Sequence, residues 1–216
     1  MPNSWDRRAV LYDLCEGSDL RRGSHKRALF ERIRGRTLFV GVGTGIDIKH
    51  LPSGRGIIAI DYNRAMIEKS RQRCKRFADR VLLVQGDAGA LSFQDGEFET
   101  VVTSCTMCSV PDPGKAFAEL YRVLTPGGQL LMFEHVRSRN PILGPILDAM
   151  SILSRRQGTH MNRDTLLAAA QAGFDIRQVE PVFLDIILAV EARKHSSQAS
   201  WTDRKAAAPT GGFNHG

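Results

Sequence analysis

A buried strand that runs directly into a glycine-rich loop constrains this chain more than any other feature. Residues 37–45 read Thr-Leu-Phe-Val-Gly-Val-Gly-Thr-Gly, so an apolar run rich in β-forming residues ends in three glycines at alternate positions. Such a loop lets the backbone approach a ligand closely, although a tight turn from a strand to a helix would use the same residues. A dinucleotide-binding fingerprint, G-x-G-x-x-G, needs glycine at position 46, where Ile46 stands. The spacing therefore disfavours an NAD-linked oxidoreductase.

Strand-like and helix-like segments alternate along the rest of the chain. Apolar runs of strand length are separated by amphipathic segments and by breaks rich in Gly and Pro. This alternation predicts an α/β fold with a doubly wound, seven-stranded, mostly parallel sheet whose last two strands form an antiparallel pair at one edge. The expected strands span residues 37–40, 56–60, 81–84, 100–104, 129–133, 174–179 and 183–192, and the expected helices span 4–16, 22–34, 46–51, 64–78, 114–124 and 162–172.

Single residues indicate how some of these helices begin and which side they bury. Ala28, Leu29 and Ile33 recur at helical spacing and are expected to face the core. Asn63 and Asn162 precede helical segments and are expected N-caps.

Length and composition indicate one cytoplasmic domain with irregular ends. The chain has 216 residues, of which 42% are hydrophobic, enough for one core. Apolar stretches fall short of the ~18 residues that span a bilayer, and charges occur throughout residues 1–20, so we expect neither a transmembrane helix nor a signal peptide. Four cysteines without a secretory signal are expected to be free thiols.

The net charge of +7 is concentrated near the N-terminus. Residues 1–80 contain 18 Lys/Arg against 9 Asp/Glu. One interpretation is attraction to an anionic membrane surface, an acidic partner or nucleic acid; the other is a solvated helix face. Nucleic acid is disfavoured because Phe77 is the one aromatic residue within the basic run, which leaves no base-stacking surface. The run comprises Arg64, Lys69, Arg71, Arg73, Lys75, Arg76 and Arg80.

Acidic residues follow two of the expected strands. Asp61 ends the strand 56–60, and Asp87 comes shortly after the strand 81–84. Ligands of open α/β sheets bind outside the carboxyl ends of the strands, where an acidic side chain can accept hydrogen bonds from a ribose diol. We expect Asp61 to have this role, the alternative being a cap for the next helix.

Several segments in a fixed order resemble the class I S-adenosylmethionine (SAM)-dependent methyltransferases. These are the G-x-G-x-G loop, Gly86-Asp87-Ala88, residues 91–99 (Leu-Ser-Phe-Gln-Asp-Gly-Glu-Phe-Glu) and residues 124–130 (Leu-Thr-Pro-Gly-Gly-Gln-Leu). The resemblance covers residues 11–194. It is nearest to the ubiquinone/menaquinone methyltransferases, to membrane-associated thiol methyltransferases and to bacterial phospholipid N-methyltransferases.

The resemblance implies a Rossmann-like methyltransferase fold with SAM as cofactor. It implies N-terminal helices over residues 1–34 that close over the cofactor, a methyltransferase domain over 35–195, and a tail over 196–216 that we expect to be disordered. One departure is Phe39, which stands where the family has an acidic residue that supports the amino acid end of the cofactor. The cofactor-binding residues implied are Tyr12, Gly41, Gly43, Thr44, Gly45, Asp61, Tyr62, Met66, Asp87, Ala88, Ser104 and Cys105.

Candidate catalytic residues lie after the later strands. Glu134 and His135 are expected at the mouth of the cleft, and His135, followed by His160, is a candidate general base because imidazole titrates near neutrality. Either histidine could instead be structural. Cys105-x-x-Cys108 has no second ligand pair, so we expect no metal site but a cleft wall beside the transferred methyl group.

The leading hypothesis is methyl transfer from SAM to a small, apolar or lipid-like acceptor: a thiol, an amine or a quinone-type ring. The alternatives are a phosphatidylethanolamine N-methyltransferase at a membrane surface and a SAM-binding protein without transfer activity, which Phe39 would allow. Residues 142–153 form a substrate lid, an interfacial helix or a plain core helix. Peripheral contact with an anionic membrane is one expectation, and the oligomeric state is left open.

Overall fold

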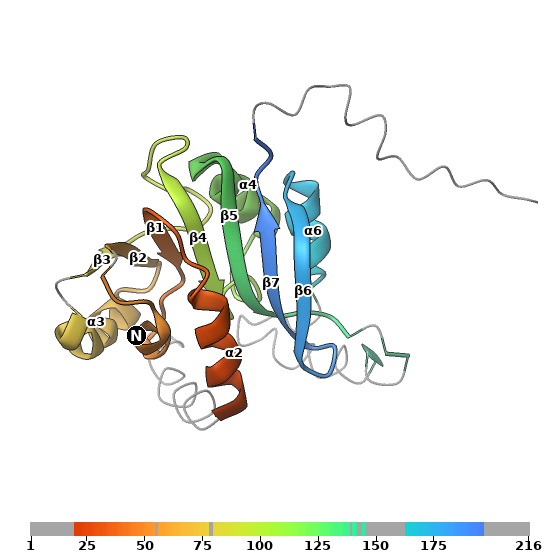
Figure 1. The fold of residues 1–216 in the computed structure, drawn as a ribbon, viewed down its shortest axis with the longest axis horizontal. Coiled ribbons are helices and arrows are strands. Elements are labelled where there is room, and N and C mark those ends of the chain that lie inside the picture. The colour runs from red at the N-terminus through yellow and green to blue at the C-terminus, as the bar shows by residue number, and fades with distance from the viewer. Residues whose placement is uncertain are drawn as a thin grey trace, which may run out of the picture.

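The computed structural model describes residues 20–54, 56–77, 80–138, 140–141, 144–145 and 163–196. Its centre is a seven-stranded sheet in which five neighbouring strands run parallel and the last two pairings are antiparallel (Figure 1). The predicted doubly wound sheet with an antiparallel pair at one edge is confirmed. Across the sheet the strands are β3 (Val81–Gln85), β2 (Ile57–Asp61), β1 (Thr37–Val40), β4 (Phe98–Ser104), β5 (Leu124–His135), β7 (Ile187–Arg193) and β6 (Asp175–Phe183).

Helices cover both faces of this sheet. One apolar core lies beneath α2 (Leu20–Phe30) and α3 (Arg64–Cys74), and a second lies beneath α4 (Pro113–Val123) and α6 (Thr165–Gln171) (Figure 1). Two short 3-10 helices, η1 (Ile46–His50) and η2 (Lys75–Phe77), complete the described elements. Within the described ranges, no helix has the length and apolar character needed to cross a membrane.

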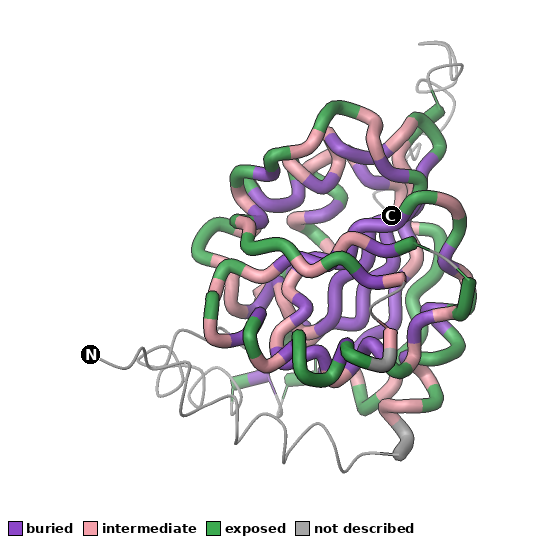
Figure 2. Tube along the Cα trace, turned by 90° about the vertical axis from the view of Figure 1, so that its left-hand side faces the viewer, coloured by how far each residue is buried: buried purple, intermediate pink, exposed green. Residues whose placement is uncertain are grey.

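Buried residues concentrate on the sheet, between the helical layers (Figure 2). Successive side chains of β1 point to opposite faces, so Leu38 and Val40 enter the core beneath α4 while Phe39 faces α2. The rings of Phe39 and Phe30 meet edge to face with centroids 5.9 Å apart. β1 therefore contributes apolar packing at position 39, with no charge.

The end of α2 and the side that this helix buries differ from the prediction. α2 ends at Phe30, because the amide of Ile33 bonds to the carbonyl of Phe30 in a tighter turn that continues the chain towards β1. Ala28 is exposed, and the buried side of the helix carries Lys26 with Leu29.

The cap of α6 is Asp164, whose carboxylate accepts the amide of Leu167 at 3.0 Å. Asn162, the expected cap, lies outside the described residues, as do the expected helix at 4–16 and the segment 146–162. Asn63 caps α3 as predicted.

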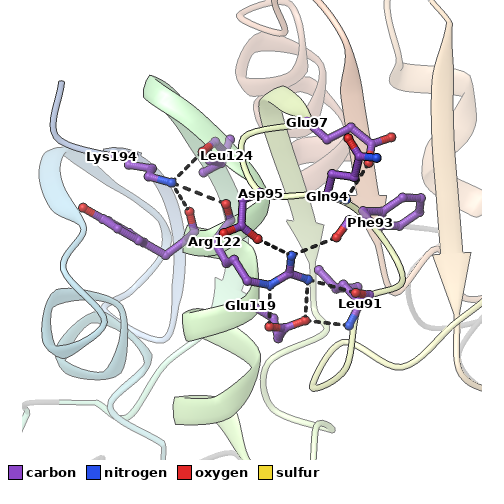
Figure 3. Close-up of polar contacts among 10 residues, drawn as sticks. Leu91, Phe93, Gln94, Asp95, Glu97, Glu119, Arg122, Leu124 and Lys194 are labelled. Atoms are coloured by element: carbon purple, nitrogen blue, oxygen red, sulfur yellow. Dashed lines mark hydrogen bonds and ion pairs between the residues drawn. The ribbon is translucent and has the colours of Figure 1, made fainter. Parts of the chain in front are cut away.

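Arg122, in the last turn of α4, fixes the segment that joins β3 to β4 (Figure 3). Its guanidinium donates to the carbonyl oxygens of Leu91 and Phe93 at 2.9 and 2.8 Å, and it pairs with Asp95 and Glu119 at 2.7 and 2.8 Å. Several donors of one planar group are thus satisfied at once. The chain that follows Asp87 is held to a rigid helix.

Candidate cofactor-binding site

The loop between β1 and η1 has left-handed backbones at its three glycines, with φ of 73°, 57° and 78° at Gly41, Gly43 and Gly45. A Cβ atom at Gly41 would lie 2.3 Å from the side chain of Thr106, and one at Gly45 would lie 2.9 Å from the Oγ of Ser70. A Cβ atom at Gly43 would meet nothing within 4 Å. Gly41 and Gly45 therefore serve internal packing, whereas Gly43 faces open space that a ligand can enter.

Side chains from α3 hold this loop in place. The hydroxyl of Ser70 donates to the carbonyl of Gly43 at 2.8 Å. Arg73 donates to the carbonyl of Thr44 at 3.0 Å and also to its hydroxyl, so Thr44, fully buried, belongs to the internal side of the loop. In the sequence Arg73 is one residue of a basic run, and nothing in the local pattern predicts that its guanidinium reaches the loop.

Other cations of that run also have partners within the protein. Arg80 donates to the carbonyl of Pro52 at 2.9 Å and lies over the ring of Phe77, and Arg71 pairs with Glu68 at 3.0 Å. At least part of the N-terminal excess of positive charge therefore has a structural role.

Asp61 links the tip of β2 to the glycine loop. Its two carboxylate oxygens accept the amides of Gly43 at 2.8 Å and Asn63 at 2.9 Å. Burial raises the pKa of Asp61, and the two amide hydrogen bonds oppose that rise. Each oxygen retains a lone pair that can accept a ribose hydroxyl. Since Asn63 caps α3 with its own side chain, Asp61 is not the helix cap.

The predicted nucleoside residues gather at the same rim. The amide of Gly86, just after β3, donates to the carbonyl of Asp61 at 3.0 Å, which places the ends of the two strands side by side. Asp87 follows as an exposed residue whose carboxylate accepts the amide of Gly89 at 2.8 Å, and Ala88 is nearly buried. Tyr62 is 73% exposed beside Asp61. Met66 is nearly buried in α3.

The loop after β4 is anchored by a buried carboxylate. Both oxygens of Glu134 accept backbone amides, from Thr106 at 3.1 Å and from Met107 at 3.2 Å, and Arg163 donates to the carbonyls of Met107 and Val110. Glu134 is 1% exposed, so its expected place at the mouth of the cleft was wrong. The side chain of Glu134 points into the protein instead, where it accepts backbone amides of the loop after β4.

The two cysteines of this loop differ in environment. Cys105 is half-buried and has a left-handed backbone, with φ of 51°, and its amide donates to the carbonyl of Phe133 at 2.7 Å. Cys108 is buried, and desolvation raises the pKa of its thiol to about 12, which keeps it neutral. Cys108 is therefore a core residue and does not form a cleft wall. Ser104 ends β4, and Cys105 follows it directly, so these two predicted site residues lie at the tip of the strand.

His135 ends β5 and is half-buried at the rim, next to Val136. Val136 lines a cavity of about 570 Å³ that also reaches Leu188 of β7 and Pro141. A cavity of about 620 Å³ beside Arg36 and Glu97 lies instead where β1 and β4 begin, at the opposite end of the sheet from Asp61. His160 and Tyr12, also predicted site residues, lie outside the described residues.

Two charged residues beside the predicted Ser104, Lys26 and Asp47, were not predicted as site residues. Lys26 of α2 forms a buried ion pair with Asp47 of η1 at 2.9 Å, and the hydroxyl of Ser104 donates to Asp47 at 2.7 Å. Lys26 and Ser104 are 21 and 57 residues away from Asp47 in the sequence, so no local pattern predicts that these side chains meet.

The strand tips thus define a site of the class that binds an adenosyl nucleotide at a glycine loop. The open side of Gly43 and the remaining acceptor capacity of Asp61 fit the ribose of such a cofactor. Residues 38–132 match the family model described as a methyltransferase domain. The chain carries a class I SAM-dependent methyltransferase domain, as its sequence motifs predicted.

Named relatives share this domain. A ubiquinone/menaquinone biosynthesis C-methyltransferase of Methylobacterium nodulans is 37% identical over 66% of this chain and 60% of its own length. A phosphatidylethanolamine N-methyltransferase of Cereibacter sphaeroides is 28% identical over 71% of this chain and 77% of its own length. The human thiol S-methyltransferase TMT1B is 32% identical over 57% of this chain and 55% of its own length. The chain therefore spans little more than half of two of these three relatives.

A solved structure agrees with the fold. A putative methyltransferase from Bacillus halodurans superposes with a TM-score of 0.64, covering 80% of this chain and all of the other, at 18% sequence identity. The architecture is confirmed as that of Rossmann-like methyltransferases.

Gly43→Ala should weaken SAM binding at least about tenfold, about 1.4 kcal/mol, because the added Cβ occupies the open space where the ribose would lie. Gly54→Ala is the matched control, since Gly54 also has a positive φ, of 74°, and nothing within 4 Å of an added Cβ. Each substitution should cost about 1–2 kcal/mol of stability through backbone strain. Calorimetric titration with SAM measures the effect, and equal affinities of the two variants would contradict the site.

Because Glu134 is buried, the free energy of unfolding of the protein should fall as the pH rises towards neutrality. Burial raises the pKa of Glu134 from 4.5 to about 7, so the unfolded state loses its proton first and stability falls between about pH 4.5 and 7, then stays level. Glu134→Gln keeps one acceptor and does not titrate. The difference in unfolding free energy between wild type and Glu134→Gln should change by about 3 kcal/mol over this interval in urea titrations. A difference independent of pH would refute the assignment.

Proposed function

We propose that the protein transfers the methyl group of SAM to a small, apolar or lipid-like acceptor that binds beside the rim. The observation that carries this proposal is the cavity of about 570 Å³ at the ends of β5 and β7. In the sheet order, β5 lies next to β4 on the side away from Asp61, so the cavity lies along the same edge of the sheet, beyond β4. Its apolar lining comes from Val136, Pro141, Pro145, Leu166, Val179 and Leu188.

Polar contacts tie one wall of this cavity to the β6–β7 hairpin. The hydroxyl of Ser138 donates to both carboxylate oxygens of Asp185, at 2.7 and 2.9 Å, and the amide of Asn140 donates to the same carboxylate at 3.2 Å. A wall held by these hydrogen bonds can position an acceptor, and positioning of the acceptor is the main requirement for methyl transfer.

SAM supplies an activated methyl group, so the protein must mainly place the acceptor in line with it. Orientation of this kind accounts for several kcal/mol of barrier reduction, up to about 7–11 kcal/mol in favourable cases. A general base is needed only for an acceptor that arrives protonated, such as a thiol. His135, the last residue of β5 at the rim of the sheet, is the residue we propose for that role.

Exposed apolar residues next to the cavity favour a lipid-like acceptor. Phe183 and Leu184, at the turn of the β6–β7 hairpin, are 52% and 56% exposed, and Val179 of the cavity lining is 42% exposed. Such a patch is compatible with peripheral contact with a membrane surface. The three named relatives act, by their names, on a quinone precursor, on phosphatidylethanolamine and on thiols, which are the three acceptor classes we propose to compare.

Transfer of label from radioactive SAM to a panel of acceptors tests the proposal. The panel comprises a demethylated quinol, vesicles of phosphatidylethanolamine and an alkyl thiol, and we expect turnover with at least one. Val179→Trp should raise the KM of that acceptor at least about fivefold, about 1 kcal/mol, by filling the cavity, without changing the Kd of SAM. Leu167→Trp is the control, because Leu167 is 52% exposed on α6 and does not line the cavity.

SAM binding without any product across the panel would favour the alternative, a SAM-binding protein without transfer activity. Turnover that is unchanged in Val179→Trp would place the acceptor elsewhere.

The base role of His135 is tested with the thiol acceptor. His135→Gln should lower kcat about 100-fold at pH 7 and by less at a pH above the thiol pKa, where no base is needed. The Kd of SAM should stay within about twofold, a difference below 0.5 kcal/mol. His195→Gln, in the exposed segment after β7, is the control. Equal loss of kcat at every pH would make His135 a structural residue.

A further inference from the structure

Two opposite charges are buried together at the rim of the sheet. The ammonium of Lys26 lies 2.9 and 3.0 Å from the two carboxylate oxygens of Asp47, and the two side chains are 3% and 7% exposed. The hydroxyl of Ser104 donates to the same carboxylate at 2.7 Å. The cluster joins the N-terminal helix α2, the helix η1 after the glycine loop and the last residue of β4.

The position of this cluster relative to the nucleoside residues is fixed by the sheet order. Asp61 ends β2, on one side of β1 and its glycine loop, and Ser104 ends β4, on the other side. Asp47 comes two residues after Gly45, and Lys26 lies 5.0 Å from the ring centroid of Phe133 in β5. A cofactor whose ribose meets Asp61 and crosses Gly43 must therefore extend its remaining part towards Ser104 and Asp47.

Burial of an ion pair does not by itself stabilise a fold. Removing two charges from water costs as much as their attraction returns, and apolar residues of similar size often serve stability equally well. Stability alone therefore gives little reason for charges at these two positions. The amino acid end of SAM carries an ammonium and a carboxylate on one carbon, and a fixed anion beside a fixed cation complements that arrangement.

β1 has no charged side chain that could bind the amino acid end of the cofactor, so another element must supply the charge. Phe39 occupies the strand position before the loop with a fully apolar side chain that packs on Phe30 of α2. Asp47 is the buried acidic residue that follows the loop, and its carboxylate has capacity for one acceptor bond beyond the three made by Lys26 and Ser104.

We propose that Asp47 and Lys26 bind the zwitterionic amino acid end of the cofactor. Asp47 accepts a hydrogen bond from its ammonium, Lys26 neutralises its carboxylate, and Ser104 holds Asp47 in position. This contact orients the sulfonium towards the cavity beyond β5. It rests on the SAM assignment but not on which acceptor is used.

Two ligands that differ in the amino acid end test this role by calorimetry. S-adenosylhomocysteine carries both charges, and 5′-methylthioadenosine has the same nucleoside and sulfur without them. Asp47→Asn should weaken binding of S-adenosylhomocysteine about 10- to 100-fold, as expected for loss of a charge-assisted hydrogen bond, and change binding of 5′-methylthioadenosine less than about twofold. Glu97→Gln, which alters a carboxylate paired with Arg36 at the opposite end of the sheet, should affect neither ligand.

A second variant distinguishes a loss of ligand binding from a loss of the fold. The double substitution Lys26→Met with Asp47→Leu removes both charges, so no unpaired charge stays buried, and it should retain the fold by circular dichroism. It should bind the two ligands with nearly equal affinity, whereas wild type prefers S-adenosylhomocysteine. Equal losses for both ligands in Asp47→Asn, or a preference that survives in the double variant, would overturn the proposal. Wild type that binds neither ligand would overturn the SAM assignment with it.

Discussion

The hydrogen bond from the amide of Gly43 to the carboxylate of Asp61 is the interaction on which the site depends. It joins the loop after β1 to the tip of β2 at 2.8 Å, and both atoms belong to groups that a nucleoside would contact. Ser70 supports it from α3 by bonding the carbonyl of the same glycine. The loop therefore has one defined shape before any ligand arrives, which reduces the ordering that binding requires.

The rim of the sheet extends this site in two directions. Towards β3 the rim carries Asp87, the residue expected at the base of the nucleoside. Towards β4 and β5 it carries Ser104 and the Glu134-anchored loop, and the apolar cavity lies at the ends of β5 and β7. Because parallel strands present all their carboxyl ends on one edge, donor and acceptor can meet there with little further architecture.

The fold and the grouping of Asp61 and Asp87 with the glycine loop at one rim could be predicted from sequence because their signals are local. Apolar runs that end in glycine or aspartate fix both the strands and the position of Asp61 at a strand end. Helix boundaries were less certain: the chain has two good capping residues near the start of α6, Asn162 and Asp164, and the cap is Asp164, which accepts the amide of Leu167. The contacts of Arg73, Glu134 and Lys26 could not be predicted, because each joins elements that are distant in sequence, and a charged residue is usually read as exposed. Phe39 was recognised as a departure, but its packing on Phe30 required the structure.

The central claim is that successive strand tips gather one adenosyl cofactor at a single edge of the sheet. A crystal structure with S-adenosylhomocysteine tests it most directly. We expect electron density for the ribose within hydrogen-bonding distance of Asp61, the base beside Asp87 and the sulfur above the tip of β4. Density at the opposite edge, near Arg36 and Glu97, or a nucleoside without contact to the glycine loop, would contradict the account.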